Sequence, residues 1–177
     1  RGFNVTIPHK TAIIPFLDQL TPAAAAIGAV NTVINRDGWL VGDNTDGLGF
    51  LQSLREEAEF DPAGSRTVIV GAGGAARAVA ASSADAGAAR VVIANRTLAR
   101  AQELADVVKG RGAQAAALAL DSPELEEELA AADLLVQTTP AGMSGEAEAV
   151  LPVPESWLRP PLIVCDIVYT PPETPLL

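Results

Sequence analysis

Cysteine, histidine and methionine are nearly absent from this chain, which limits the chemistry that it can carry. Each occurs once among the 177 residues. The single cysteine, Cys165, excludes an internal disulfide and is typical of a reducing compartment. Because it lies in the apolar run 162–165, we interpret it as a small core residue and not as a nucleophile. No group of His, Cys and carboxylate residues has ligand spacing, so we expect no metal site.

Positive charge and long apolar runs are also scarce. The chain has 12 Lys and Arg residues against 22 Asp and Glu residues, and the formal net charge of −10 argues against nucleic acid as a general partner. The acidic run 124–128 has helical spacing that spreads its carboxylates around a solvated face, so we do not interpret it as a metal site. We find no membrane span and no signal peptide, and we expect a cytoplasmic protein.

The ends of the chain bear on its domain organisation. It begins with Arg1 and not with methionine, and it ends abruptly after the residues 175–177, so we expect a piece of a longer protein. We predict part of a substrate-binding domain over 1–45, a connecting helix and linker over 46–60, and a nucleotide-binding domain over 61–177.

Strands and helices alternate in the second part of the chain. We predict strands over 67–71, 90–95, 114–119, 133–137 and 162–168. The predicted helices between them cover 74–87, 97–109 and 122–131, with a short one near 154–158. Strands that are separated by helices pair in parallel. The fold class is therefore α/β, with a Rossmann-like doubly wound parallel sheet and part of an α/β substrate domain.

The first 60 residues have a less regular pattern. Alternation over 1–8 predicts a strand, and apolar spacing over 10–20 predicts a helix that Pro15 kinks. The other predicted elements are a short helix from Thr21 to Gly28, a hairpin around 36–38, and a helix over 46–59 with the apolar stripe Leu48, Phe50, Leu51 and Leu54.

A glycine cluster between a predicted strand and a predicted helix is the strongest functional signal. Gly71, Gly73 and Ala76 occupy the three marked positions of the dinucleotide fingerprint G-x-G-x-x-G/A. Gly71 permits the tight turn, Gly73 lets the backbone approach a pyrophosphate, and Ala76 lets the helix pack closely on the sheet. The N–H groups that begin the helix then face the anion. The alternative is a plain strand–helix turn.

The end of the next strand indicates which dinucleotide binds. In an NAD site, an acidic residue about 20 residues past the glycines binds the ribose hydroxyls. Asn95, Arg96 and Thr97 stand at that corner here. Arg96 could bind a 2′-phosphate with its planar guanidinium, and Arg100 could add a second charge. The alternative is that Asn95 or Thr97 caps the next helix while Arg96 is solvated. We favour NADP over NAD.

Three polar residues of the first part suggest the reduction of a carbonyl group. Lys10 follows a strand end, Asp46 begins a helix whose dipole favours a carboxylate, and Asn31 interrupts an apolar strand. A lysine beside a carboxylate can supply the proton that a ketone needs when a hydride donor reduces it. Asn31 could hold substrate hydroxyls. The structural alternatives are a solvated helix start for Lys10, a first-turn stabiliser for Asp46 and an edge-strand residue for Asn31.

Several segments together resemble the shikimate dehydrogenase family. The segments that resemble its substrate domain are NVTIPHK at 4–10, GAVNT at 28–32 and NTDG at 44–47. Those that resemble its NADP domain are VGAGGAAR at 70–77, NRT at 95–97, TTPAGM at 138–143 and DIVY at 166–169. The resemblance runs from Asn4 to Leu177 in the order of the family.

The resemblance implies a reversible, NADPH-dependent reduction of 3-dehydroshikimate to shikimate, in chorismate and aromatic amino acid biosynthesis. Lys10 and Asp46 would be the catalytic pair, and Thr6, Asn31 and Tyr169 would bind the substrate. The residues implied in NADP binding are Gly71, Ala72, Gly73, Gly74 and Ala75 at the pyrophosphate, Asn95, Arg96 and Thr97 at the ribose phosphate, and Thr138, Thr139 and Met143 near the ribose and nicotinamide. We expect a monomer or homodimer with this small-molecule substrate.

The ends of the chain depart from the family pattern. The family begins with a section whose Ser-x-Ser segment binds the substrate carboxylate, and it ends with helices that supply a glutamine to the substrate. Neither section is in this sequence, so we expect the stretch to bind cofactor but to turn over poorly or not at all. Two alternatives remain: an NAD-dependent quinate/shikimate dehydrogenase, which we expect to carry an acid near 95–97, and a non-catalytic NADP-binding module, against which the intact Lys10 and Asp46 argue.

Overall fold

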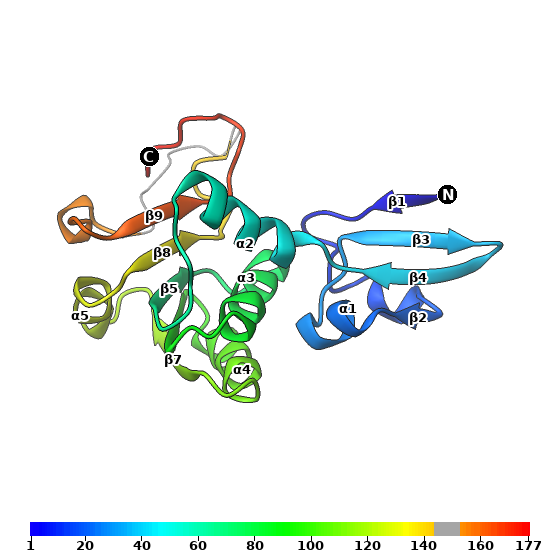
Figure 1. Ribbon diagram of the computed structural model, residues 1–177, viewed down its shortest axis with the longest axis horizontal. Coiled ribbons are helices and arrows are strands. Elements are labelled where there is room, and N and C mark those ends of the chain that lie inside the picture. Colours follow the sequence, from blue (N-terminus) through cyan, green and yellow to red (C-terminus); the bar gives the residue numbers. More distant parts are fainter. Residues whose placement is uncertain (144–152) are drawn as a thin grey trace.

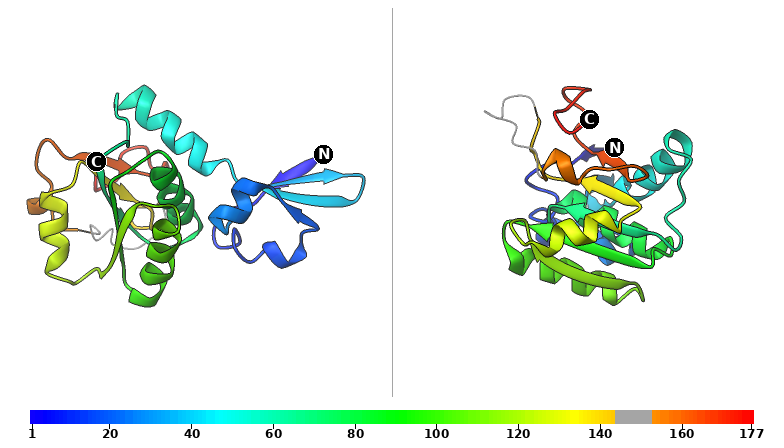
Figure 2. Two further views of the ribbon diagram at one scale, coloured as in Figure 1. Left: turned by 60° about the horizontal axis from the view of Figure 1, so that its bottom comes forward. Right: turned by 90° about the vertical axis from the view of Figure 1, so that its left-hand side faces the viewer.

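The computed structural model describes residues 1–143 and 153–177, which form a smaller and a larger lobe (Figure 1). Each lobe contains one sheet. The helix α2 (Asp46–Glu57) leads from the smaller lobe, which comes first in the chain, to the larger one. The left view of Figure 2 shows the two lobes side by side, with α2 running from one to the other.

Five parallel strands form the sheet of the larger lobe, in the order β7-β6-β5-β8-β9. They are β5 (Arg66–Val70), β6 (Arg90–Asn95), β7 (Gln114–Ala119), β8 (Leu134–Gln137) and β9 (Ile163–Asp166). The order reverses at β5, and ligands of such sheets bind outside the carboxyl ends of the strands at this switch point. The predicted Rossmann-like doubly wound sheet is confirmed.

Helices cover both faces of this sheet. They are α3 (Gly74–Asp85), α4 (Leu98–Lys109), α5 (Glu124–Ala130) and the 3-10 helix η2 (Glu155–Trp157). Ile69 and Ile93 pack against α2, α3 and α4, whereas Val68 and Val92 pack against α5 and η2. Because successive side chains of a strand point to opposite faces, both faces need apolar residues, and the strands are therefore apolar throughout.

The smaller lobe has a four-stranded sheet in the order β1-β3-β4-β2. Its strands are β1 (Gly2–Asn4), β2 (Gln19–Leu20), β3 (Thr32–Arg36) and β4 (Trp39–Asp43). The predicted hairpin is β3–β4, and the predicted short helix is α1 (Pro22–Ile27). The Thr21 side chain accepts a hydrogen bond from Ala24 N–H at 3.2 Å, and α1 ends at Gly28 with a φ of 71°.

The predicted helix over 10–20 is wrong. This segment contains turns, a 3-10 helix η1 (Ile14–Phe16) and the short strand β2. Pro15 explains the difference, because it lacks an N–H group and disfavours helical backbone at the residue before it. Ile13, Ile14, Leu17 and Leu20 still pack on the core of the smaller lobe, so turns satisfy the same apolar spacing that suggested a helix.

Two other local predictions need correction. The strand predicted over 1–8 is shorter, because only Gly2–Asn4 pairs with β3. Leu48 does not belong to the apolar stripe of α2, since it is 73% exposed while Phe50 and Leu54 are buried. Two residues of a helix lie about 200° apart, so Leu48 and Phe50 face nearly opposite directions.

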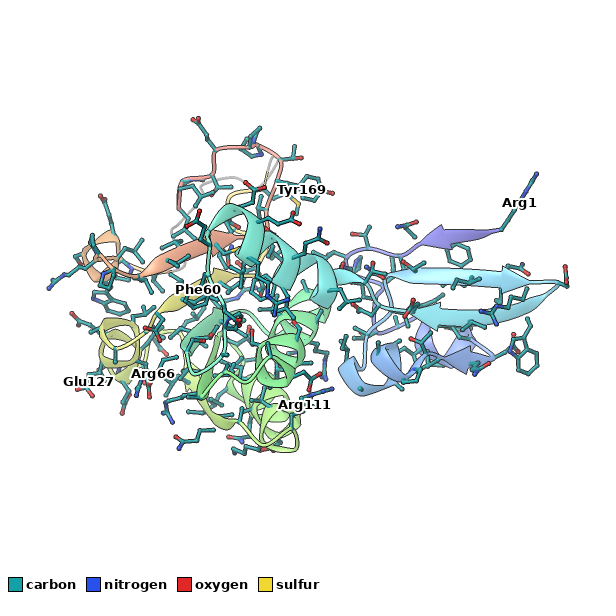
Figure 3. The ribbon with its side chains drawn as sticks, viewed as in Figure 1. Arg1, Phe60, Arg66, Arg111, Glu127 and Tyr169 are labelled. Carbon is teal, nitrogen blue, oxygen red and sulfur yellow. The ribbon has the colours of Figure 1, made fainter. Side chains whose placement is uncertain are left out.

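The two lobes contact each other through α1 and α3. The packed apolar residues at this contact are Ile27, Ala29, Ala78 and Ala81. Arg111 donates from Nη1 to both oxygens of Asp85 at 2.7 Å and from Nη2 to the Ala26 carbonyl at 2.6 Å. Figure 3 shows Arg111 on the side of the larger lobe that faces α1. The guanidinium therefore joins the end of α3 to the end of α1.

Candidate active site

A cleft of about 940 Å³ lies at the carboxyl ends of β5, β6 and β8. It gathers the glycine turn after β5, the loops after β6 and β8, and a segment of the smaller lobe. The lining residues are Ile7, Pro8, Lys10, Thr11, Gly71, Ala72, Gly73, Gly74, Ala75, Arg77, Asn95, Arg96, Arg100, Glu103, Leu120, Thr138, Thr139, Pro140, Ala141 and Gly142. Both lobes thus contribute to one site.

The turn between β5 and α3 requires glycine at its first position. Gly71 has a φ of 113°, and a Cβ atom there would overlap the hydroxyl of Thr138. That hydroxyl donates to the Val70 carbonyl at 2.6 Å, while Gly71 N–H donates to the Ala94 carbonyl at 2.8 Å. These bonds fix the turn at the strand ends. The turn and the positive end of the 12-residue helix α3 fit a pyrophosphate.

The loop after β8 is organised by Gln137, which the sequence reasoning missed. Gln137 is fully buried at the end of β8. Its Nε2 donates to the carbonyls of Thr139 and Ala141 at 3.0 and 3.2 Å, and its Oε1 accepts from Thr139 N–H at 2.9 Å and from the Thr139 hydroxyl at 3.0 Å. The available signal was a glutamine that ends an apolar strand at the ligand-binding edge.

Positive charge gathers where β6 ends. Arg96 and Arg100 are exposed, line the cleft and have no ion-pair partner within residues 1–143 and 153–177. Asn95 Nδ2 donates to the Thr97 carbonyl at 2.9 Å, and the Thr97 side chain makes no cap hydrogen bond to α4. Two free guanidinium groups in a chain of net charge −10 fit a phosphate group.

Arg77 and Glu103 also line the cleft and were not among the predicted site residues. Arg77 lies in the first turn of α3 and Glu103 on α4, and their side chains form an ion pair at 3.5 Å. The pair neutralises a carboxylate that would otherwise repel an anionic ligand. Only Arg77 had a sequence signal, because it follows the glycine motif directly.

Lys10 and Asp46 form an ion pair beside the cleft. Lys10 Nζ lies 2.6 Å from Asp46 Oδ2, and the two side chains are 14% and 29% exposed. Asp46 is the first residue of α2, where the helix dipole favours a carboxylate. The Lys10 carbonyl accepts from Val30 N–H at 2.7 Å, which ties the lysine to the residue before Asn31. The structure therefore brings together residues from three separate segments.

Asn31 completes this group of polar residues. Its Nδ2 donates to Asp46 Oδ1 at 2.7 Å and to the Thr45 hydroxyl at 3.0 Å. Its Oδ1 accepts from Thr45 N–H at 3.1 Å and from the Thr32 hydroxyl at 2.9 Å. Each oxygen of Asp46 thus accepts one hydrogen bond, which fixes the plane of the carboxylate and the direction of Lys10. The carboxylate keeps acceptor capacity for a ligand hydroxyl.

Six predicted site residues do not line the cleft. Asp46 and Asn31 are joined to it through Lys10, and the other four are Thr6, Thr97, Met143 and Tyr169. Thr6, Thr97 and Met143 are exposed. Thr97 lies after β6 and Met143 lies in the loop after β8, but neither lines the cleft. Tyr169 follows β9 and is 86% exposed; Figure 3 shows it on the larger lobe beside α2. Their roles at the site stay predictions.

Cys165 lies outside the cleft, in β9. Its side chain packs on the core beneath α2, and burial, with a smaller effect of Asp166, raises the pKa of the thiol. Among residues 1–143 and 153–177, no group of His, Cys, Asp and Glu side chains could hold a metal ion. Over the same ranges, no helix has the length and apolar character needed to cross a membrane.

Comparison with known proteins gives the family. Residues 1–33 match the family model "Shikimate dehydrogenase substrate binding domain", and residues 54–167 match "Shikimate / quinate 5-dehydrogenase". The chain belongs to the shikimate/quinate dehydrogenase family. The predicted resemblance is therefore confirmed.

Individual members of the family are similar along nearly the whole chain. A shikimate dehydrogenase (NADP(+)) of Moorella thermoacetica is 54% identical and aligns with 100% of this chain. The structure of a shikimate 5-dehydrogenase from Listeria monocytogenes, in complex with shikimate and NAD, matches 100% of the chain at 40% identity and a TM-score of 0.83. A quinate dehydrogenase from Corynebacterium glutamicum, in complex with NAD, matches 99% at 36% identity and a TM-score of 0.84.

The match covers only part of these family members. The chain spans 60% of the Moorella protein, 63% of the Listeria chain and 62% of the Corynebacterium chain. It contains the strands and loops that form the cleft described above.

Proposed function

We propose that this chain is the cofactor-binding and catalytic part of an NADP-dependent shikimate dehydrogenase. The reaction is the reversible reduction of 3-dehydroshikimate to shikimate. The observation that supports it most is the Lys10–Asp46 pair, with Nζ 2.6 Å from Oδ2, whose lysine lines the same cleft as the glycine turn. A plain nucleotide-binding module has no need of a shielded ion pair at this place. The name of the Moorella relative agrees with the proposal.

Reduction of a ketone needs a hydride at carbon and a proton at oxygen. The reduced nicotinamide supplies the hydride when it is bound. The Lys10 ammonium has three N–H donors, of which one is bonded to Asp46 Oδ2, so two remain for the carbonyl oxygen of the substrate. Asp46 holds the ammonium in place, and Asn31 holds Asp46. Asp46 keeps acceptor capacity, and we assign it a neighbouring hydroxyl of the substrate. The four hydrogen-bonding positions of Asn31 are occupied within the protein, so a substrate hydroxyl would replace one of these bonds.

The choice of NADP over NAD rests on the corner after β6. Arg96 and Arg100 are available there for a 2′-phosphate, and the corner 95–97 contains no carboxylate for ribose hydroxyls. We assign the pyrophosphate to the segment 71–75 at the start of α3. Thr138 and Thr139 remain our proposed contacts to the ribose and nicotinamide.

The second candidate is an NAD-dependent quinate dehydrogenase, since the Corynebacterium structure is described as that enzyme with NAD. The test is the reduction of NADP⁺ and NAD⁺, followed by absorbance, with shikimate and with quinate. It uses the protein as its gene encodes it, and this 177-residue chain in parallel. Turnover of shikimate with NADP⁺ alone supports the proposal. Turnover of quinate or use of NAD⁺ favours the second candidate, and binding of NADPH without any turnover would leave only a binding module.

A further inference from the structure

The side chain of Lys10 lies directly on the backbone of Gly74. A Cβ atom built on Gly74 would stand 2.9 Å from Lys10 Cβ and 3.2 Å from Lys10 Cδ. The dinucleotide fingerprint requires small residues at positions 71, 73 and 76 and makes no demand on position 74. Gly74 is also not among the glycines with positive φ, so its backbone is open to other residues. The contact with Lys10 therefore explains why position 74 has no side chain.

A second glycine places Asp46 against the same helix. Gly47 follows Asp46 in α2, and a Cβ atom on it would stand 3.2 Å from Ser82 Cβ and 3.3 Å from the Ala78 carbonyl, both in α3. Two residues further along α2, a Cβ atom on Gly49 would meet nothing within 4 Å. Gly49 faces nearly the opposite direction to Gly47, so the backbone of α2 meets α3 closely at the position next to Asp46 and is open at position 49.

We propose that Gly74 and Gly47 are positioning residues that fix the Lys10–Asp46 pair on α3. The inference rests on the proposed function. Lys10 and Asp46 can form their ion pair wherever the smaller lobe lies, but catalysis needs the pair at a set distance from the nicotinamide. Lys10 touches the first residue of α3, and Gly47, the neighbour of Asp46, touches the same helix at Ala78 and Ser82. The first turn of α3 is where the pyrophosphate is proposed to bind. One helix therefore serves as the common reference for the cofactor and for the proton donor.

Gly74→Ala forces the aliphatic part of Lys10 to move. Carbon atoms in contact are about 3.5–4.0 Å apart, so the displacement from 2.9 Å is roughly 0.6–1.1 Å. A misplacement of about 1 Å can cost about 100-fold in rate. Because the displacement is at most about 1 Å, we expect kcat to fall by about 10- to 100-fold. The new methyl group points at Lys10, so the NADPH dissociation constant stays within about threefold, a change of under 1 kcal/mol.

The matched variants are Gly47→Ala and Gly49→Ala, which add the same methyl group to α2. The contacts of Gly47 are at 3.2–3.3 Å, so its variant needs a smaller shift and loses less kcat than Gly74→Ala. Gly49→Ala keeps the kcat of the unmodified protein. Alanine favours helix over glycine, so all three variants are expected to fold.

A double-mutant cycle identifies the partner of Gly74. If Gly74→Ala acts by moving Lys10, it has no further effect on the residual kcat of Lys10→Gly, which also removes the Cβ atom that lies 2.9 Å away. An equal fold loss in both backgrounds overturns the inference, as does an unchanged kcat or a loss confined to NADPH binding.

A spectroscopic readout keeps this test separate from that of the proposed function. The chain has two lysines, Lys10 and Lys109, so ¹³C-labelled lysine gives a reporter and an internal control. The Lys10 signal is assigned by its loss in Lys10→Ala. We expect it to shift in Gly74→Ala and to stay in place in Gly49→Ala; no shift in Gly74→Ala overturns the contact even if shikimate is not the substrate. Inactivity of the unmodified protein with every substrate tested overturns the proposed function alone.

Discussion

Replacement of Arg96 by alanine tests how the cleft distinguishes NADPH from NADH. The side chain is exposed, lines the cleft and has no ion-pair partner within residues 1–143 and 153–177, so the variant leaves no buried charge behind. A hydrogen bond to a charged group contributes about 1.5–3 kcal/mol. Because solvent screens Arg96, we expect the lower part of this range, which corresponds to an increase of about 10- to 50-fold in the NADPH dissociation constant. The NADH dissociation constant should change by less than about twofold on the same scale.

The assay is a titration of each coenzyme against the protein, read by nicotinamide fluorescence. Arg55→Ala is the matched control, because Arg55 is exposed on α2 and does not line the cleft. The preference of the unmodified protein for NADPH should also weaken as salt is added, because exposed charges are screened. An equal loss of affinity for NADPH and NADH in Arg96→Ala would refute the assignment of Arg96 to the 2′-phosphate.

Three further predictions concern other parts of the chain. Lys10→Ala should lower kcat by about 100- to 10,000-fold with little change in NADPH affinity, measured by steady-state kinetics and titration; surviving turnover would exclude Lys10 as the proton donor. Glu128→Gln should lower the free energy of unfolding at neutral pH by about 1–3 kcal/mol, whereas Glu127→Gln, on the same helix, should change it little. The hydrogen bond from Arg90, at 2.5 Å, holds the pKa of Glu128 below its ordinary value. The stabilisation is therefore present above the pKa of a glutamate in the unfolded chain and is lost as the pH falls through the pKa of Glu128 in the folded protein. Urea unfolding from neutral to acidic pH measures this loss, and a difference between the two variants that stays constant with pH would contradict the argument. Cys165 should react slowly with a thiol reagent at neutral pH, because burial raises the pKa of its thiol, and a rate like that of free cysteine would contradict its burial.

The parts of the fold that could be predicted are those with local causes. The glycine turn follows from the φ of Gly71, and the larger sheet follows from apolar runs separated by helices. The prediction over 10–20 was wrong because apolar spacing reports which side chains are buried and not how the backbone connects them. Leu48 was wrongly assigned to the apolar stripe of α2 because its neighbours in the sequence are apolar. Whether a residue belongs to that stripe depends on the direction in which its side chain leaves the helix.

The site was predictable only as far as motifs reach. Lys10, Asp46 and Arg96 stand in recognisable segments, so the sequence pointed to them. The bonds of Gln137 depend on the path of the loop after it, and the contact of Lys10 with Gly74 joins two lobes that no local pattern relates. Such contacts between distant segments had no signal in a single sequence.

The bonds of Arg111 determine how the cleft can widen. The guanidinium links Asp85 to the Ala26 carbonyl beside the packed contact of α1 and α3, so sliding one lobe over the other would break all of these interactions together. A hinge rotation with α3 as its axis would keep the contacts that lie nearest to that helix. Lys10 rests on the first residue of that helix and therefore lies close to the pivot. In such a rotation the hairpin β3–β4, which lies far from α3 (Figure 1), would move most, and Lys10 would stay near the proposed pyrophosphate site.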